Sequence, residues 1–133
     1  MERIDLFIKG TVGVIGTFVS YLVDGFGLAF AILLGMMALD YISGLMVAIS
    51  TKTLSSSVGI KGLIKKMYII ILIGAIYLLG LAIEGLNYIG DGVAIAYIGI
   101  EFISLAENGG KLGVPLGPIK KVIAVLKNQD GEK

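Results

Sequence analysis

Two carboxylic acids lie within the long apolar stretches of this chain, and their side chains have the clearest potential for chemistry. At a rise of about 1.5 Å per residue, Asp40 lies about 18 Å along a helix from Lys52. Glu101 lies about 15 Å from Lys111 by the same measure. Both acids are therefore expected near the middle of a bilayer, where a charged Asp costs about 2.5 to 3.5 kcal/mol. Because no Lys or Arg falls deep within an apolar stretch, we expect no salt bridge within one chain.

Small and polar residues share a helix face with each acid, because side chains three, four or seven positions apart lie on one side of a helix. The two polar stripes comprise Asp40, Ser43 and Gly44, and Glu101, Ser104, Glu107 and Asn108. Within a membrane such stripes join helices by hydrogen bonds or line an aqueous passage. Three interpretations remain open: hydrogen bonding inside one monomer, formation of an oligomer or pore, and an ion-binding or proton-relay site. The acids either carry a proton or face water and other polar groups.

The residue types that most catalytic and metal sites require are missing from the sequence. The chain has no Cys and no His, which excludes disulfides, thiol chemistry, a histidine base and zinc sites with nitrogen or sulfur ligands. No common hydrolase, phosphate-binding or metalloprotease motif occurs. Two carboxylates alone also lack the further oxygen ligands of a cation cage. We therefore predict no enzymatic activity, no cofactor and no metal ion.

The composition indicates that lipid surrounds the elements that carry these residues. Hydrophobic residues make up 56% of the 133 positions, and the mean hydropathy of +0.95 is far outside the range of ordinary soluble proteins. A soluble protein this apolar would expose large patches that promote aggregation. The net charge is only +1, so no strongly basic field favours nucleic acid.

The apolar runs predict an all-α integral membrane protein with about four transmembrane helices in a single domain, residues 1–133. A spanning helix needs about 20 mainly apolar residues. The predicted spans cover approximately residues 6–23, 26–50, 67–85 and 91–108. The first span is marginal because Lys9 lies at its edge and three glycines interrupt it. A helix lying in the membrane interface is the alternative for that segment.

The distribution of charge predicts how the chain crosses the bilayer. The basic residues all fall outside the apolar runs or at their edges, and one threading places them on one side: Arg3, Lys9, Lys52, Lys61, Lys65, Lys66, Lys111, Lys120, Lys121, Lys127 and Lys133. The connections on the opposite side carry only the acids Asp24, Glu84 and Asp91. Basic residues are retained on the cytoplasmic side. We therefore predict cytoplasmic termini and a multi-pass protein of the bacterial cytoplasmic membrane.

Two basic segments are expected at the inner leaflet, a cytoplasmic loop over residues 51–66 and a tail over residues 109–133. In the tail, Gly109 and Gly110 are expected to end the fourth span, and a short amphipathic helix begins near Pro118. A disordered tail is the alternative. The lysines predicted to face anionic lipid are Lys61, Lys65, Lys66, Lys120, Lys121 and Lys127.

Four sequence segments, in this order, resemble a known family. They are LDYISG at residues 39–44, LSS with the following glycines and lysines at residues 54–66, EFISLAEN at residues 101–108, and KLGVP at residues 111–115. The Asp-Gly pair at residues 24–25 also matches. The chain resembles the toxin-secretion and phage-lysis holins of mainly Gram-positive bacteria and their phages (phage holin, family 4 type). The resemblance extends from about Asp24 to Leu126.

The resemblance implies a holin that collects in the cytoplasmic membrane and homo-oligomerises there. At a set moment such a protein opens a non-specific lesion through which an endolysin or an exported toxin crosses. Its partners would be the lipid bilayer, further copies of the chain and, functionally, that enzyme or toxin. The positions that match the family motifs are Asp40, Ser43, Glu101, Ser104, Glu107 and Asn108, and the resemblance assigns none of them an individual role.

Two other functions fit the same size and topology. A small proton-coupled multidrug exporter subunit would use a membrane carboxylate, but it is expected to have aromatic residues around that acid. Here the chain has no Trp, and only Tyr41 adjoins Asp40 in sequence. An antiholin or membrane adaptor, which binds a holin without opening a lesion, is the third possibility.

Overall fold

The computed structural model describes residues 1–86 and 88–131, and this part of the chain is helical without strands. Its five helices are α1 (Glu2–Phe26), α2 (Leu28–Ser50), α3 (Ser56–Ala82), α4 (Ile89–Lys111) and α5 (Gly117–Gly131). The first four are long and apolar enough to cross a membrane. The predicted all-α class with four spanning helices is therefore confirmed. Lys133, counted among the basic residues of the tail, lies outside the described residues.

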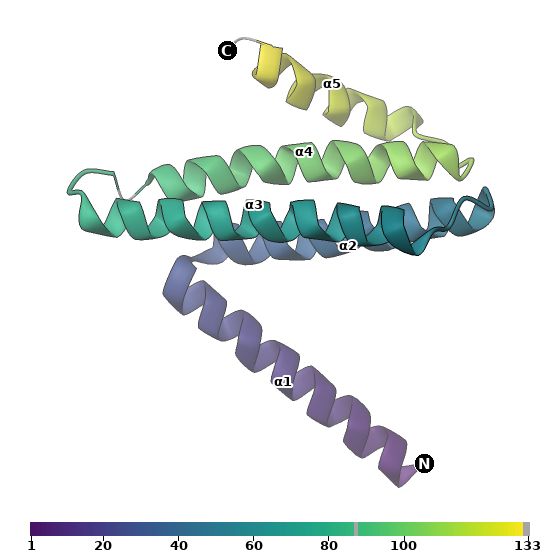
Figure 1. The fold of residues 1–133 in the computed structure, drawn as a ribbon, viewed down its shortest axis with the longest axis horizontal. Helices are drawn as coiled ribbons and strands as arrows, with labels where there is room; N and C mark the ends of the chain where they lie inside the picture. Colours follow the sequence, from purple (N-terminus) through teal and green to yellow (C-terminus); the bar gives the residue numbers. More distant parts are fainter. Residues whose placement is uncertain (87, 132–133) are drawn as a thin grey trace.

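Helix α3 runs antiparallel to α2 and α4, which are parallel to each other, and the three helices form one bundle (Figure 1). α2 and α4 make the most extensive contact, and α3 packs against both. The centre of the bundle is a dry apolar cluster of Phe30, Leu33, Met37, Ile73 and Ala94. Most other large apolar side chains face outward, as expected where lipid replaces water around the helices.

Helix α3 begins eleven residues earlier than predicted, so the expected loop over residues 51–66 is wrong for residues 56–66. Only the segment between Ser50 and Ser56 connects α2 to α3. Ser55 has extended backbone angles (φ −140°, ψ 134°) at the N-cap position, and no proline follows in the helix. Gly59 does not break the helix but packs below Tyr41, whose hydroxyl donates a 3.3 Å hydrogen bond to the Gly59 carbonyl. Lys61, Lys65 and Lys66 are consequently helical residues.

Helix α4 continues through Gly109 and Gly110 to Lys111, so the predicted break at these glycines is also wrong. The chain then turns back, and Leu116 packs against this last turn. A Cβ atom at position 110 would lie 3.1 Å from Leu116 Cδ1. The glycine therefore permits a close approach of the following segment instead of ending the helix.

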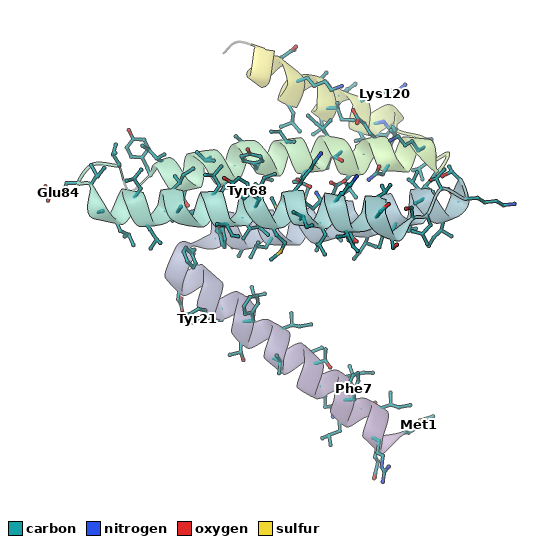
Figure 2. The ribbon with its side chains drawn as sticks, viewed as in Figure 1. Met1, Phe7, Tyr21, Tyr68, Glu84 and Lys120 are labelled. Carbon is teal, nitrogen blue, oxygen red and sulfur yellow. The ribbon has the colours of Figure 1, made fainter. Side chains whose placement is uncertain are left out.

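Helix α5 folds back beside α4, in agreement with the predicted short C-terminal helix (Figure 1). Leu126 of α5 rests near Gly99, with its Cδ2 atom 3.5 Å from a Cβ built at that glycine. Lys120 and Lys121 are exposed. In Figure 2, Lys120 lies toward one end of the bundle, and Glu84 lies at the opposite end.

Helix α1 leaves the bundle at Gly27, which has φ +95° and is the single residue between α1 and α2. This left-handed backbone angle favours glycine, because other residues carry a Cβ that clashes there. α1 contacts α2 only near this junction and otherwise diverges from the other helices (Figures 1 and 2). Its described side chains up to Tyr21 are all exposed.

The two ends of the bundle differ in charge in the predicted way. The α2–α3 connection, which contains Lys52, and the α4–α5 connection, which follows Lys111, lie at the same end (Figure 1). The α3–α4 connection, which contains Glu84, lies at the other end. The lysine-rich segments are therefore not placed on opposite sides. Which end faces the cytoplasm stays a prediction from the charge distribution.

Candidate functional site in the helix bundle

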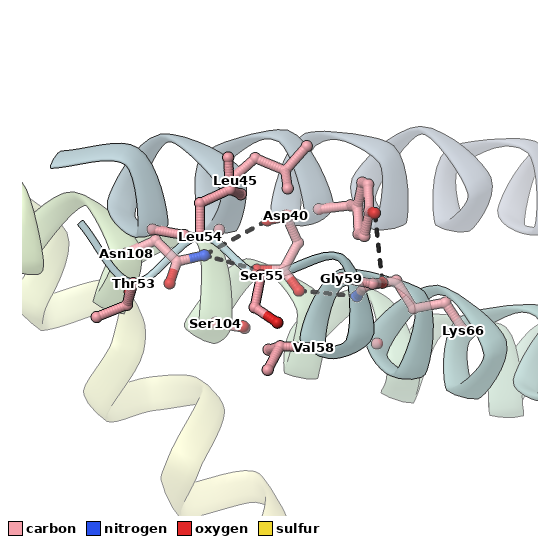
Figure 3. Close-up of a pocket in the computed structure, with 14 residues that line it drawn as sticks. Asp40, Leu45, Thr53, Leu54, Ser55, Val58, Gly59, Lys66, Ser104 and Asn108 are labelled. Atoms are coloured by element: carbon pink, nitrogen blue, oxygen red, sulfur yellow. Dashed lines mark hydrogen bonds and ion pairs between the residues drawn. The ribbon is translucent and has the colours of Figure 1, made fainter. Parts of the chain in front are cut away.

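Three charged side chains from three different helices meet inside the bundle. Lys66 Nζ on α3 donates hydrogen bonds to Asp40 Oδ2 on α2 at 2.8 Å and to Glu101 Oε2 on α4 at 2.6 Å. The Asp40 and Glu101 side chains are only 9% and 6% exposed, and that of Lys66 is 17% exposed. We call these three residues the charged cluster. Figure 3 shows Lys66 reaching toward Asp40 between the helices.

The prediction that no salt bridge forms within one chain is wrong, and the reason is the earlier start of α3. With the helix beginning at Ser56, Lys66 lies roughly 15 Å along the helix axis from its N-terminal end. That distance brings the ammonium group to a depth similar to that of the two acids. Lys66 was predicted among the lysines at the inner leaflet, and it is instead the cation of the charged cluster.

A neutral amide completes the hydrogen bonding of Asp40. Asn108 Nδ2 donates to Asp40 Oδ1 at 3.1 Å and to Ser43 Oγ at 2.8 Å, and the Ser43 hydroxyl donates to the Asp40 carbonyl oxygen at 2.8 Å. Gly44 leaves room for this contact, because a Cβ there would lie 3.8 Å from Asn108 Nδ2. Among the described residues, no buried side-chain nitrogen or oxygen lacks a hydrogen-bond partner. The polar stripes on α2 and α4 thus satisfy each other within one chain.

A pocket of about 290 Å³ adjoins the cluster on the side of the α2–α3 connection. Its polar wall includes Asp40, Lys66, Ser104 and Asn108, while Leu45, Leu54 and Val58 supply apolar surface (Figure 3). On the other side of the cluster lies the dry core around Leu33 and Ile73, which are fully buried. The charged cluster therefore has a polar opening toward the end of the bundle that carries the α2–α3 connection.

The structure brings together most of the residues predicted for the polar stripes, but one of them lies elsewhere. Glu107 is 57% exposed at its side chain and forms a loose 3.9 Å ion pair with Lys127 of α5. It does not join the cluster. Lys61 and Lys65 are also exposed, so contact with lipid head groups stays a prediction for these residues and for Lys120, Lys121 and Lys127.

Sequence reasoning missed the surface that lets Lys66 reach the acids. Gly59, Gly62 and Lys66 recur at intervals of three and four and therefore share one face of α3. Both glycines line the pocket. This periodicity, together with the absence of proline after Ser56, was the available signal that the lysines belong to a helix and that one of them faces inward.

The geometry suits the pairing of buried charges between helices better than catalysis or metal binding. Among the described residues, no group of three or more acidic, His or Cys side chains could hold a metal ion. The Lys66 ammonium occupies the position between the two carboxylates. Removing one partner of a buried ion pair costs about 3 to 5 kcal/mol, because the other charge is left uncompensated. Lys66 thus connects α2, α3 and α4 electrostatically.

A second polar contact lies at the other end of the bundle. The Tyr77 hydroxyl donates a 2.6 Å hydrogen bond to Asp91 Oδ1, and the Tyr77 ring packs edge-on against Phe26 and Phe30. Gly90 is buried beneath that ring, where a Cβ would lie 2.5 Å from Tyr77 Cδ1. This contact fixes the start of α4 against α3 and α2.

These features define a multi-pass α-helical membrane protein with a charged cluster held between its spans. The chain belongs to the bacteriophage holin family, whose family model matches residues 17–128. The resemblance noted from the four sequence segments is thereby confirmed, as is a multi-pass location in the cytoplasmic membrane. The family is one of non-enzymatic membrane proteins.

Two similar proteins match this chain over nearly their whole length. An uncharacterised protein of Halalkalibacterium halodurans is 29% identical, covering 96% of this chain and 99% of its own. An uncharacterised 14.9 kDa protein in the nagH 3′ region of Clostridium perfringens is 30% identical over 97% of this chain and 99% of its own. An uncharacterised protein of Listeria innocua is 34% identical over 85% of this chain and 76% of its own. No solved structure matches the chain at a significant level.

Proposed function

We propose that the protein is a holin that homo-oligomerises in the cytoplasmic membrane and opens a non-specific lesion. An endolysin, or an exported toxin, would cross through this lesion at a set moment. Membership of the bacteriophage holin family supports a phage holin role. The observation that carries the mechanism is the charged cluster, because it gives the chain a closed arrangement in which Lys66 pairs with both membrane-embedded acids.

In the proposed closed state, Lys66 pairs with Asp40 and Glu101 inside each chain, and the polar stripes are hidden from lipid. In the open state, neighbouring chains assemble and the same stripes line water. The charges are then hydrated, so the ion pairs contribute less to holding α2, α3 and α4 together. A change in membrane potential biases this transition, since moving one charge across 100 mV changes the energy by about 2.3 kcal/mol.

Helix α1 is the proposed surface for assembly. Its described side chains are exposed up to Tyr21, and it diverges from the bundle, so a neighbouring chain can pack against it. Close approach of helices within a membrane is favoured by small residues, which α1 supplies at Gly10, Gly13 and Gly16. No catalytic activity is proposed for any part of the chain.

Expression in bacteria, with and without a muralytic enzyme, tests this function. A holin is expected to stop growth abruptly when expressed alone, and the culture should lyse only when the enzyme is co-expressed. Growth that continues with increased drug resistance would instead identify an exporter. Growth that continues with neither effect, but with delayed lysis by a second holin, would identify an antiholin or adaptor.

A further inference from the structure

The charged cluster contains an excess of one negative charge if all three of its groups are ionised. Asp40 and Glu101 supply two carboxylates, and Lys66 supplies one ammonium group. The other polar groups in contact with the cluster are neutral: Ser43, Ser104 and Asn108. An uncompensated charge near the middle of a bilayer costs several kcal/mol. A further cation is therefore expected to neutralise the cluster.

A metal ion does not suit this position. Hard cations such as Ca²⁺ take six to eight oxygen ligands, and the Lys66 ammonium already lies between the carboxylate oxygens at 2.8 and 2.6 Å. Asp40 Oδ2 and Glu101 Oε2 both accept a hydrogen bond from Lys66 Nζ, at 2.8 and 2.6 Å, so the two carboxyl groups are neighbours in one site. Two carboxylates that share a site repel each other, and a proton on one of them removes this repulsion. The geometry thus favours a proton as the second cation.

The pocket beside the cluster offers a path for that proton. It has a volume of about 290 Å³, ample for several waters, and its polar wall runs from Thr53 and Ser55 near the α2–α3 connection to Asp40 and Lys66. Toward the opposite end, the cluster is bordered by the apolar core, where Leu33 and Ile73 are fully buried. The polar opening of the cluster therefore lies at the end of the bundle that carries the α2–α3 connection.

We propose that the cluster binds one proton, shared between Asp40 and Glu101, and that this proton enters through the pocket from the end of the bundle that carries the α2–α3 connection. The proton passes from water to a carboxylate oxygen, and the formal charge of the cluster changes from −1 to zero. The charged groups that face this proton come from each helix of the bundle: Asp40 from α2, Lys66 from α3 and Glu101 from α4.

This inference deepens the proposed function, because a neutral cluster favours the closed chain and a negative cluster favours exposure of the stripes to water. It links opening to the supply of protons at one membrane surface. The binding itself can be measured without lysis. A failure of one proposal is therefore distinguishable from a failure of the other.

Infrared difference spectroscopy of the purified protein in liposomes tests the binding of the proton. The wild-type chain is expected to show the band of a protonated carboxylic acid at neutral pH. Glu101→Gln and Asp40→Asn should each abolish that band, because the remaining carboxylate and Lys66 form a neutral pair. Glu107→Gln is the matched control on the same helix, and it should retain the band because Glu107 is exposed.

Filling the pocket tests the path. Gly62 lines the pocket, and a Cβ there meets no atom within 4 Å, so Gly62→Leu places its side chain in the open space. In D₂O the band of the wild-type chain should shift rapidly, and Gly62→Leu should lose this rapid phase. Gly74→Leu on the same helix is the control, since Gly74 also has free space around it but lies outside the pocket lining.

Two results would overturn the proposal. A wild-type spectrum without the band of a protonated acid would contradict the binding of a proton. So would a band that persists in both the Glu101→Gln and the Asp40→Asn variants. Rapid exchange that persists in the Gly62→Leu variant would contradict entry of the proton through the pocket. Circular dichroism and gel filtration establish that each variant is folded. Because the two acid variants change different helices, one of them remains informative if the other fails to fold.

Discussion

Replacing Lys66 with methionine removes the cation that pairs with acids of both other central helices. The methionine side chain has a similar length and no charge, so it preserves most of the packing while it eliminates the contacts at 2.8 and 2.6 Å. Asp40 and Glu101 then remain buried without a counter-charge. In the closed chain the two acids, which share one proton, then carry an uncompensated negative charge, whereas water in an open assembly would solvate that charge.

The expected size of the effect follows from the burial of the cluster. Breaking a buried pair costs about 3 to 5 kcal/mol. Lys66 is 17% exposed and borders the pocket, where water screens its charge, so we expect the lower end of this range. At about 1.4 kcal/mol for each factor of ten, a loss of about 3 kcal/mol shifts the equilibrium between closed and open states by about 100-fold. Lysis should therefore begin earlier and at a lower protein level.

A lysis assay with titratable expression and a co-expressed muralytic enzyme measures this shift, with protein levels followed by immunoblot. Lys65→Met is the matched control, because Lys65 precedes Lys66 on the same helix and is exposed. It should lyse on the wild-type schedule. The triple variant Lys66→Met, Asp40→Asn, Glu101→Gln removes all three charges. It should restore the closed state and delay lysis, because uncharged groups can replace a buried ion network without loss of stability.

Two results would refute this reasoning about Lys66. One is unchanged lysis timing in Lys66→Met at equal protein level. The other is a triple variant that lyses as early as Lys66→Met, because the effect would then not depend on the uncompensated acids.

Three further predictions concern packing and assembly. Leu33→Ala should lower the unfolding free energy of the bundle by about 2 kcal/mol in a detergent unfolding titration. This is the low end for such changes, because lipid is as apolar as the core and only packing is lost. Leu39→Ala is the control and should have no effect, because Leu39 is 53% exposed. Gly90→Leu should destabilise it by about 1 to 3 kcal/mol in the same titration, since its Cβ overlaps the Tyr77 ring. In this cysteine-free chain, Val14→Cys should form disulfide-linked dimers before lysis, which non-reducing gels would detect. Leu33→Cys is the control and should form no such dimers, because Leu33 is fully buried.

The sequence alone determined the environment of the protein and the depth of its acids. Runs of apolar residues fix four membrane-crossing helices, because the backbone must satisfy its own hydrogen bonds in lipid. Asp40 and Glu101 could be placed near mid-bilayer by counting residues from the nearest basic positions. Ser43 could be assigned to the helix face that carries Asp40, and Asn108 to the face that carries Glu101. These assignments need only the sequence, because helical periodicity depends on sequence spacing.

Only the tertiary structure decided what compensates those acids. Hydropathy places Lys66 at the border of an apolar run, where a loop and a helix are equally compatible with its charge. The start of α3 at Ser56 turns Gly59, Gly62 and Lys66 toward α2 and α4, and the lysine then lies between two carboxylates that are 26 and 35 residues away in sequence. Such a pairing depends on how three helices pack, and no local pattern encodes it. The electrostatic energy of the bundle is therefore a property of the assembled fold, because charges interact through space and not along the chain.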